Sequence, residues 1–379
     1  MNVQTAQKTM YSSQPSKHRP LSESVSRETL DDIYRCSLKR QTGVSLKYML
    51  DFGSFPIERQ VIFSAQFLHK ELPIRLAHRV AELENLPHGL SAKSQVMQVR
   101  DWYVESFKEL RQFRKIVDRS DESDFVRILK RIYERHSNVV PMMAMGVAEL
   151  KRDFGEFPPE VHQFLDGFYM SRIGIRALIG QHVALHSQQD GYIGMICIKV
   201  RPMDVAWGAV DDARSICMRE KGSSPEVQVF GDPNFAFSYV PSHLHQMLFE
   251  LVKNSLRAVH DKYEDSDIDP PPIRIVIADG GEDVSIKVSD EGGGIPRSGL
   301  PRIWTYMYTT ADTPLLDNAD TSGVLETPPA LAGYGYGLPL SRLYARYFGG
   351  DLQILSMEGY GTDAYLHISR LGNVQEPLP

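Results

Sequence analysis

The hydrophobic pattern of this chain changes its period once, near residue 190, and that change limits the folds open to it. Before it, apolar residues recur at every third or fourth position, as Val99, Tyr103 and Phe107 do, which places them on one face of a helix. After it, apolar and polar residues alternate, as in 273–277, which is typical of a strand with one buried face. The 379 residues are too many for one ordinary core, so we expect two domains, a helical one followed by an α+β one.

The first half contains three amphipathic stripes. We expect one helix to end near Val117, a second to run from the acidic start at 121–124 to Pro141, and a third to follow Pro158. Acidic residues complement the positive end of a helix, and a proline inside a helix removes a backbone hydrogen bond. Long amphipathic helices with short connections predict a four-helix bundle, which we place at 25–190.

The second half interleaves helices with antiparallel hairpins. We expect a strand at 191–200, helices at 206–220 and from an N-cap at Ser242 to about Tyr263, a hairpin at 273–288 that turns at Gly280 and Gly281, and a final hairpin at 352–368. This order predicts a mixed sheet with helices on one face. We assign 191–371 to this domain and 372–379 to a short tail.

Composition excludes several classes of protein. The net charge of −6 argues against a general nucleic-acid or membrane-surface binder, and no apolar run approaches the length of a membrane span. Three cysteines without C-x-x-C spacing argue against a disulfide framework or a zinc site. Residues 1–22 carry basic and hydroxyl side chains and no acidic one, so we expect 1–24 to be a targeting or a disordered segment.

A carboxylate and a carboxamide share one face of the helix expected after Ser242. Glu250 and Asn254 are four residues apart, so their side chains lie one turn from each other. Such a pair can serve Mg²⁺ through hard oxygen ligands or activate a hydroxyl group. Taken alone, the same pattern is typical of a solvated helix face.

An acidic residue and three glycines follow the hairpin at 273–288. Asp290 stands at the strand end, and Gly292–Gly294 leave bare backbone beside it, where a flat ring could approach and donate an amine hydrogen bond. A flexible turn is the alternative interpretation. Thr362, which opens the last strand, would lie beside Asp290 if the two hairpins pair.

A third motif places glycines at positions 333, 335 and 337, directly before the helix expected at 341–348. Backbone N–H groups at a helix N-terminus bind phosphate, although this spacing is weak by itself and does not follow a strand of a βαβ unit. The segment 311–332 before it carries acidic side chains and no basic one. Its length predicts a mobile lid.

The order of these motifs resembles the GHKL ATPase domain of histidine kinases and gyrases. The segments 168–176, 181–182, 239–244, 306–310 and 337–348 resemble the mitochondrial pyruvate dehydrogenase kinase family, and particularly its plant branch. The resemblance runs from about Leu30 to Leu371. It implies a four-helix bundle followed by a GHKL (Bergerat) α/β sandwich with a mixed β-sheet.

The resemblance also implies roles for individual residues. Glu250 would be the catalytic base for a serine hydroxyl, Asn254 would hold Mg²⁺, and Asp290 and Thr362 would read the adenine of ATP beside Gly292 and Gly294. The residues implied around the phosphates and the lid hinge are Arg257, Thr309, Thr310, Gly333, Tyr334, Gly335, Tyr336, Gly337 and Leu338.

In the helical half, the family's pocket for pyruvate and dichloroacetate corresponds to Leu76, Tyr103, Ser106, His136, Arg172 and Arg176. Two arginines and a histidine could hold a small carboxylate. Without the resemblance, surface salt bridges and a core histidine would explain the same residues.

The implied activity is ATP-dependent phosphorylation, and so inactivation, of the α subunit of the pyruvate dehydrogenase decarboxylase component. The implied partners are the lipoyl domain of dihydrolipoyl acetyltransferase and a second copy of the chain, in the mitochondrial matrix. The alternatives are a branched-chain 2-oxoacid dehydrogenase kinase, a histidine kinase that uses His69, or another GHKL ATPase.

Two positions depart from the animal members of that family. Gln246 stands where they carry a histidine one turn before the base, which leaves the tuning of the base open. The chain ends at Pro379, without their long C-terminal tail, so we expect tail-mediated coupling across the dimer to be missing.

Overall fold

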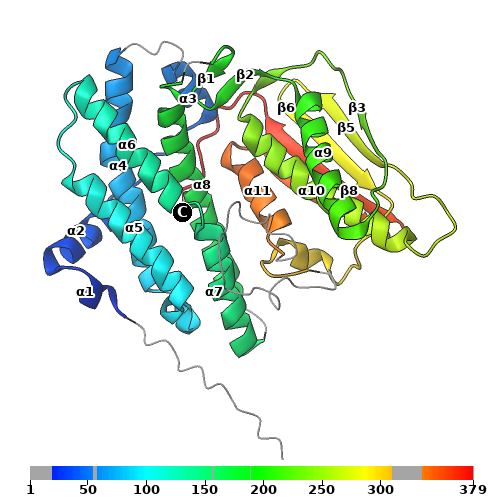
Figure 1. Ribbon diagram of the computed structural model, residues 1–379, viewed down its shortest axis with the longest axis horizontal. Helices are drawn as coiled ribbons and strands as arrows, with labels where there is room; N and C mark the ends of the chain where they lie inside the picture. Colours follow the sequence, from blue (N-terminus) through cyan, green and yellow to red (C-terminus); the bar gives the residue numbers. More distant parts are fainter. Residues whose placement is uncertain (1–18, 54–57, 156–157, 188, 310–334, 379) are drawn as a thin grey trace, which may run out of the picture.

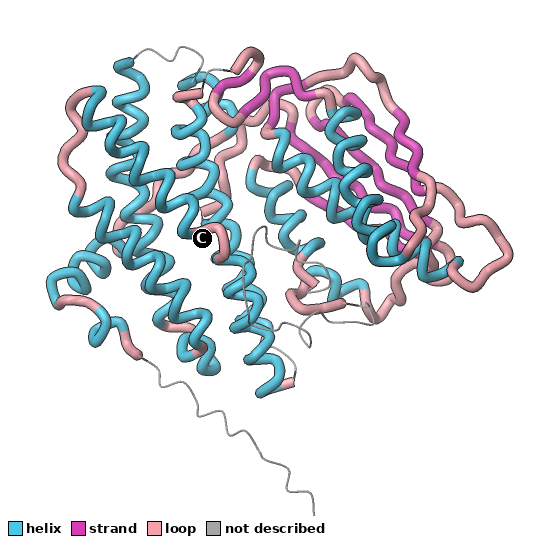
Figure 2. Tube along the Cα trace, in the orientation of Figure 1, coloured by secondary structure: helices cyan, strands magenta, loops and turns pink. Residues whose placement is uncertain are grey.

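The computed structural model describes residues 19–53, 58–155, 158–187, 189–309 and 335–378. A helical region built from the first half of the chain lies beside an α/β region built from the second (Figure 1). Figure 2 shows helices standing next to one another in the first region and strands gathered in the second. In the part of the chain that is described, no helix is long and apolar enough to cross a membrane.

Packed helices of unequal length form the helical region. They are α1 (Leu21–Ser24), α2 (Arg27–Ser37), α3 (Leu46–Gly53), α4 (Glu58–Glu84), the 3₁₀ helix η1 (Pro87–Ala92), α5 (Ser94–Gln112), α6 (Arg119–Arg135), α7 (Val139–Phe154) and α8 (Pro159–Ala184). The long helix α4 packs against α5, α6 and α8, and α7 packs against α5. The predicted helical region is therefore confirmed.

Several predicted boundaries in this region are wrong. α5 ends at Gln112, so Val117 lies beyond it and is exposed. α6 ends at Arg135, and Pro141 lies in the first turn of α7 instead of ending the helix before it. Proline fits there because the N–H groups of a first turn have no partner inside the helix.

The N-terminal segment expected at 1–24 is in part folded. Residues 1–18 lie outside the described part of the chain, but α1 follows directly. Leu21 is buried, and its backbone N–H donates to Glu84 of α4 at 2.7 Å. The residues from Leu21 onward therefore belong to the helical region.

The α/β region alternates strands with helices. Its elements are β1 (Tyr192–Ile193), β2 (Ile196–Val200), α9 (Pro202–Lys221), β3 (Val227–Phe230), β4 (Phe237–Tyr239), α10 (Pro241–Tyr263), β5 (Ile273–Asp279), β6 (Asp283–Asp290), the 3₁₀ helix η2 (Leu300–Trp304), α11 (Gly337–Tyr347), β7 (Asp351–Met357) and β8 (Gly361–Ser369). Among the described strands, five form a mixed sheet in the order β3-β5-β6-β8-β7, with only β3 and β5 parallel. Helices α9, α10 and α11 cover one face of it, as predicted (Figure 1).

Both predicted hairpins are present, as β5–β6 and β7–β8. The two hairpins pair with each other through β6 and β8, and their register sets Asp290 opposite Thr362. The apolar stripe of α10, which includes Met247, Leu251 and Val259, is buried. The alternating pattern therefore fixed both the buried face of the sheet and its register.

The start of this region differs from the prediction. The segment 191–200 is a hairpin because Gly194, at φ +61°, turns the chain between β1 and β2. β4 then pairs with β2, inside a Pro/Gly-rich stretch in which no strand was predicted. α10 begins at Pro241 after Val240, with no side-chain cap, so Ser242 is not the N-cap.

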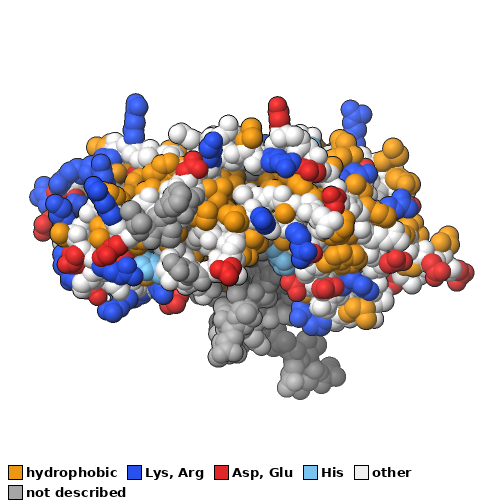
Figure 3. Space-filling model, turned by 90° about the horizontal axis from the view of Figure 1, so that it is seen from above, with side chains coloured by type: hydrophobic (Ala, Val, Ile, Leu, Met, Phe, Trp, Pro, Cys, Tyr) orange, Lys and Arg blue, Asp and Glu red, His pale blue; other side chains and the backbone are white. Residues whose placement is uncertain are grey.

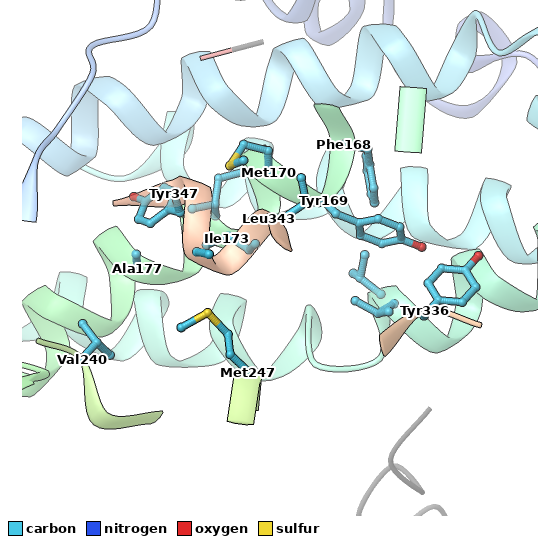
Figure 4. Packing of buried hydrophobic residues seen from close by; sticks show 14 of the residues in the cluster. Phe168, Tyr169, Met170, Ile173, Ala177, Val240, Met247, Tyr336, Leu343 and Tyr347 are labelled. Carbon is cyan, nitrogen blue, oxygen red and sulfur yellow. The ribbon is translucent and has the colours of Figure 1, made fainter. Parts of the chain in front are cut away.

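Apolar side chains fill the junction between the two regions. Figure 4 shows side chains of α8, among them Met170 and Ile173, packed around Leu343 and Tyr347 of α11. On the face drawn in Figure 3, basic and acidic side chains are interspersed with apolar ones. The buried junction holds the helical and α/β regions together.

The segment after β8, predicted as a short tail, packs onto the helical region. Gly372 accepts a hydrogen bond from the backbone N–H of Lys47 at 2.8 Å, and Glu376 and Val44 bond through their backbones at 2.9 Å. The Glu376 carboxylate is buried and lies 2.5 Å from Arg75 of α4. The C-terminal residues therefore connect the last strand to the helical region.

Candidate active site

A buried carboxylate lies in the middle of α10. Glu250 is 5 % exposed, and its Oε2 lies 2.7 Å from Nζ of Lys253. Gln246, one turn earlier, donates a long hydrogen bond of 3.5 Å to Oε1. Lys253 escaped the sequence analysis, although its i,i+3 spacing from Glu250 is a recognisable signal. The ion pair keeps a proton acceptor oriented on a rigid helix.

The third glycine motif touches this carboxylate. A Cβ on Gly337 would lie 2.3 Å from Glu250 Oε2, so any other residue at the start of α11 would displace this carboxylate. Gly335 has φ +71°, and a Cβ there would lie 2.3 Å from the carbonyl oxygen of Tyr308. These two glycines bring the N-terminus of an eleven-residue helix to the side of a potential base.

Asp290 is fixed at the end of β6 by two donors. Ser255 Oγ donates to Oδ2 at 2.8 Å, and the Gly292 N–H donates to Oδ1 at 3.0 Å. Burial raises the pKa of the Asp290 carboxyl, and these hydrogen bonds oppose that shift. Ser255 was also missed by the sequence analysis. It links α10, the helix of Glu250, to the strand that carries Asp290.

Two of the three glycines after Asp290 are packed tightly against their neighbours. A Cβ on Gly292 would lie 2.6 Å from Cβ of Ala258, and one on Gly294, at φ +71°, would lie 2.2 Å from the carbonyl oxygen of Met357. This packing argues against a flexible turn. The half-buried residues 291–295 lie beside the Asp290 carboxylate.

The remaining predicted nucleotide residues fall into three groups. Asn254 and Arg257 are half-buried on α10, and Arg257 forms no ion pair with any described residue. Thr309 is the last described residue before position 310, and Leu338 lies in the first turn of α11. Thr310, Gly333, Tyr334 and the predicted lid at 311–332 lie outside the described residues.

Tyr336 differs from the expectation of a phosphate contact. Its ring is buried and packs against Tyr169 and Tyr306, with centroid distances of 5.9 and 5.1 Å. The side chain belongs to the junction between the two regions (Figure 4). Only the backbone of Tyr336 is left to face a ligand.

A second group of predicted residues meets in the helical region. Tyr103 of α5 stacks on His136 at a centroid distance of 4.5 Å, and Ser106 Oγ lies 3.0 Å from His136 Nε2. Arg172 of α8 donates to the carbonyl oxygen of His136 at 3.3 Å. Arg176 lies over the ring of Tyr133 at 3.6 Å. Leu76 is buried on α4, and the interactions just described do not include it.

This group has the features of an anion site. Burial lowers the pKa of His136 to about 3, so the ring is neutral at physiological pH. The Tyr103 hydroxyl and Arg172 Nε are buried without a hydrogen-bond partner. Among the described residues, neither Arg172 nor Arg176 pairs with a carboxylate, so surface salt bridges do not explain them. Buried donors without partners favour a small bound anion.

Comparisons with known proteins agree with the division into two regions. Residues 43–197 match the family described as "Mitochondrial branched-chain alpha-ketoacid dehydrogenase kinase". Residues 239–371 match the family described as "Histidine kinase-, DNA gyrase B-, and HSP90-like ATPase". These matches cover both halves of the chain.

Whole-chain relatives share one name. An Arabidopsis thaliana protein is 60% identical and covers 94% of this chain and 98% of its own length. One from Drosophila melanogaster is 41% identical (89% and 84%), and one from Schizosaccharomyces pombe is 36% identical (89% and 95%). Each is called "[Pyruvate dehydrogenase (acetyl-transferring)] kinase, mitochondrial".

Proposed function

The chain belongs to the family of mitochondrial pyruvate dehydrogenase kinases, and we propose that it transfers phosphate from Mg-ATP to a serine of the pyruvate dehydrogenase decarboxylase α subunit in the mitochondrial matrix. The ATPase-family match of residues 239–371 implies ATP binding. The observation that carries the proposal is the joint placement of Glu250 and the N-terminus of α11, because a base beside a phosphate-binding helix end is the arrangement that phosphoryl transfer needs.

Each residue has a task in this reaction. Glu250 accepts the proton of the attacking serine hydroxyl, and Lys253 holds its carboxylate in place. Asp290, fixed by Ser255, accepts a hydrogen bond from the adenine amine, with Thr362 beside it. Asn254 offers the carboxamide oxygen that suits Mg²⁺. A bound Mg²⁺ would neutralise phosphate charge.

A second copy of the chain is a partner that we propose from the open face of the sheet. The face opposite α9–α11 exposes apolar side chains, including Phe230, Val276, Leu355 and Met357. The register of the five strands places them on one side. Burial of this face in a homodimer would remove apolar surface from water. The helical region would dock the lipoyl domain of the acetyltransferase component.

The α subunit of the branched-chain 2-oxoacid dehydrogenase is a second candidate for the phosphate acceptor. The helical region matches a family described by the branched-chain dehydrogenase kinase, whereas the whole-chain relatives are named for the pyruvate enzyme. We expect labelled phosphate from Mg-ATP to appear on the pyruvate dehydrogenase α subunit when both α subunits are offered separately, each with its lipoyl component. Label mainly on the branched-chain subunit would overturn the acceptor and retain the chemistry.

We propose that the anion site in the helical region binds pyruvate or dichloroacetate, and Arg172→Met tests this. The substitution keeps the length of the side chain and removes its charge. We expect at least ~10-fold weaker binding of dichloroacetate by calorimetry, because hydrogen bonds to charged groups contribute about 1.5–3 kcal/mol. Arg131→Met, at an exposed arginine of α6 that pairs with Glu109, is the matched control. Equal affinities of the two variants would exclude Arg172 from the site.

A further inference from the structure

A carboxylate and two imidazoles meet where the start of α6 lies beside the end of α8. None of the three residues belongs to the candidate active site or to the anion site. Glu122 lies in the first turn of α6, His182 lies in the last turn of α8, and His186 lies two residues beyond the end of α8. One ligand atom from each lies within 4.8 Å of the others. Glu122 and His182 are 2 % and 1 % exposed, and His186 forms the open side.

The three side chains lie close enough together to hold one ion, and an ion would replace the hydrogen bond that now joins His186 Nε2 to the Glu122 carboxylate. Glu122 Oε1 lies 3.1 Å from Nε2 of His182 and 2.8 Å from Nε2 of His186. Ligands held ~2.0–2.1 Å from a tetrahedral zinc ion stand roughly 3.3 Å apart. Two histidines at i and i+4 on one helix are a recurring zinc-binding arrangement, and here the same spacing spans the end of α8.

The inner histidine has a nitrogen without a hydrogen-bond partner. Nδ1 of His182 lies 2.8 Å from Ser64 Oγ of α4, but its buried Nε2 lacks the alignment of a hydrogen bond to Glu122 despite their closeness. If Nδ1 carries the proton and donates to Ser64, Nε2 presents a lone pair toward Glu122. Such outer contacts orient metal-binding histidines.

The surroundings leave room and charge for a cation. A cavity of about 370 Å³ adjoins the cluster, lined in part by Glu58, Arg119, Glu122 and His186. Its two carboxylates and one guanidinium carry a formal charge of −1. The cavity can supply water to a further coordination position.

We propose that Glu122, His182 and His186 bind a divalent transition-metal ion of the zinc type, with water from the cavity as a further ligand. The cysteine pattern argued against a zinc site, but this donor set needs no cysteine. The ion would join α6 to α8, and through Ser64 to α4. Gln181, next to His182, bonds to the β1–β2 hairpin at Ile193 and Met195, so the site braces the start of the α/β region.

The test uses full-length protein freed of metal by a chelator. We expect calorimetry with Zn²⁺ to give one site, Co²⁺ to give the visible absorption of a tetrahedral complex, and Zn²⁺ to raise Tm. His186→Ala should weaken Zn²⁺ binding at least ~10-fold, since even outer contacts of a metal ligand contribute 10–100-fold. Glu122→Gln should do the same, and neither variant should gain Tm on addition of Zn²⁺.

His245→Ala is the matched control. His245 is exposed to a similar degree (35% against 30% for His186) and lies 3.1 Å from the carboxylate of Asp212 on the other region of the molecule. The His245→Ala variant should bind Zn²⁺ with the same affinity as the unaltered chain. Absence of saturable Zn²⁺ binding by the unaltered chain, or binding that His186→Ala and Glu122→Gln leave unchanged, would overturn the proposal. Because His186 lies at the surface, its variant is expected to fold.

Discussion

We expect Glu250→Gln to lower kcat for phosphate transfer by about 10²–10⁴-fold while nucleotide affinity stays within a factor of about three. Glutamine keeps the size and one oxygen of the side chain, so Gly337 retains its close contact. It cannot accept the serine proton, and it leaves Lys253 without its carboxylate. The measurement is single-turnover transfer from labelled Mg-ATP, with nucleotide binding followed separately by calorimetry.

Glu264→Gln provides the control for this experiment. Glu264 is the C-cap residue of α10, so the substitution makes the same chemical change at an exposed position next to that helix. It should leave kcat unchanged. A Glu250→Gln variant that retained transfer within tenfold of the unaltered chain would remove the base assignment. A variant that lost nucleotide binding along with transfer would show instead that Glu250 supports the ligand.

The α/β region could be predicted in detail because its signals are local. Alternation with a period of two determines which side of a strand is buried, and two tight hairpins leave little freedom of register. The position of Thr362 opposite Asp290 followed from this reasoning and is confirmed. Ser255, by contrast, could not be connected to Asp290 without knowing how α10 packs on the sheet.

The helical region was harder to predict because burial on several sides erases an amphipathic stripe. In α4, the run from Glu71 to Val80 contains buried residues on every face, including Arg75 and Arg79, and Pro73 lies inside the helix. Neither a stripe nor the proline rule finds such a helix. The position of the Tyr336 ring could not be predicted for a related reason. A glycine motif carries no information about the interface with α8, where this ring packs against Tyr169.

The second large effect that we expect is a loss of stability in Arg75→Met. Arg75 lies 3.1 Å from Glu71 and 2.5 Å from Glu376, and all three side chains are buried. The substitution leaves two buried carboxylates without a cation, and breaking a buried ion pair in this way costs about 3–5 kcal/mol. Tm should fall by roughly 6–20 °C. Scanning calorimetry of the full chain measures it.

Arg346→Met supplies the comparison, because Arg346 is exposed where it pairs with the half-buried Asp351 at 2.8 Å. A pair near the surface contributes about 1 kcal/mol or less, and Asp351 keeps Arg342 at 3.2 Å, so this variant should lose little Tm. The double variant Arg75→Met, Glu376→Gln then separates charge from packing. If uncompensated charge causes the loss of stability, removing one carboxylate recovers part of the Tm. A double variant no more stable than Arg75→Met would mean that the guanidinium acts through its packing and through its hydrogen bond to the Thr42 carbonyl oxygen. Recovery would mean that charge on Arg75 and Glu376 contributes to holding the C-terminal segment on α4.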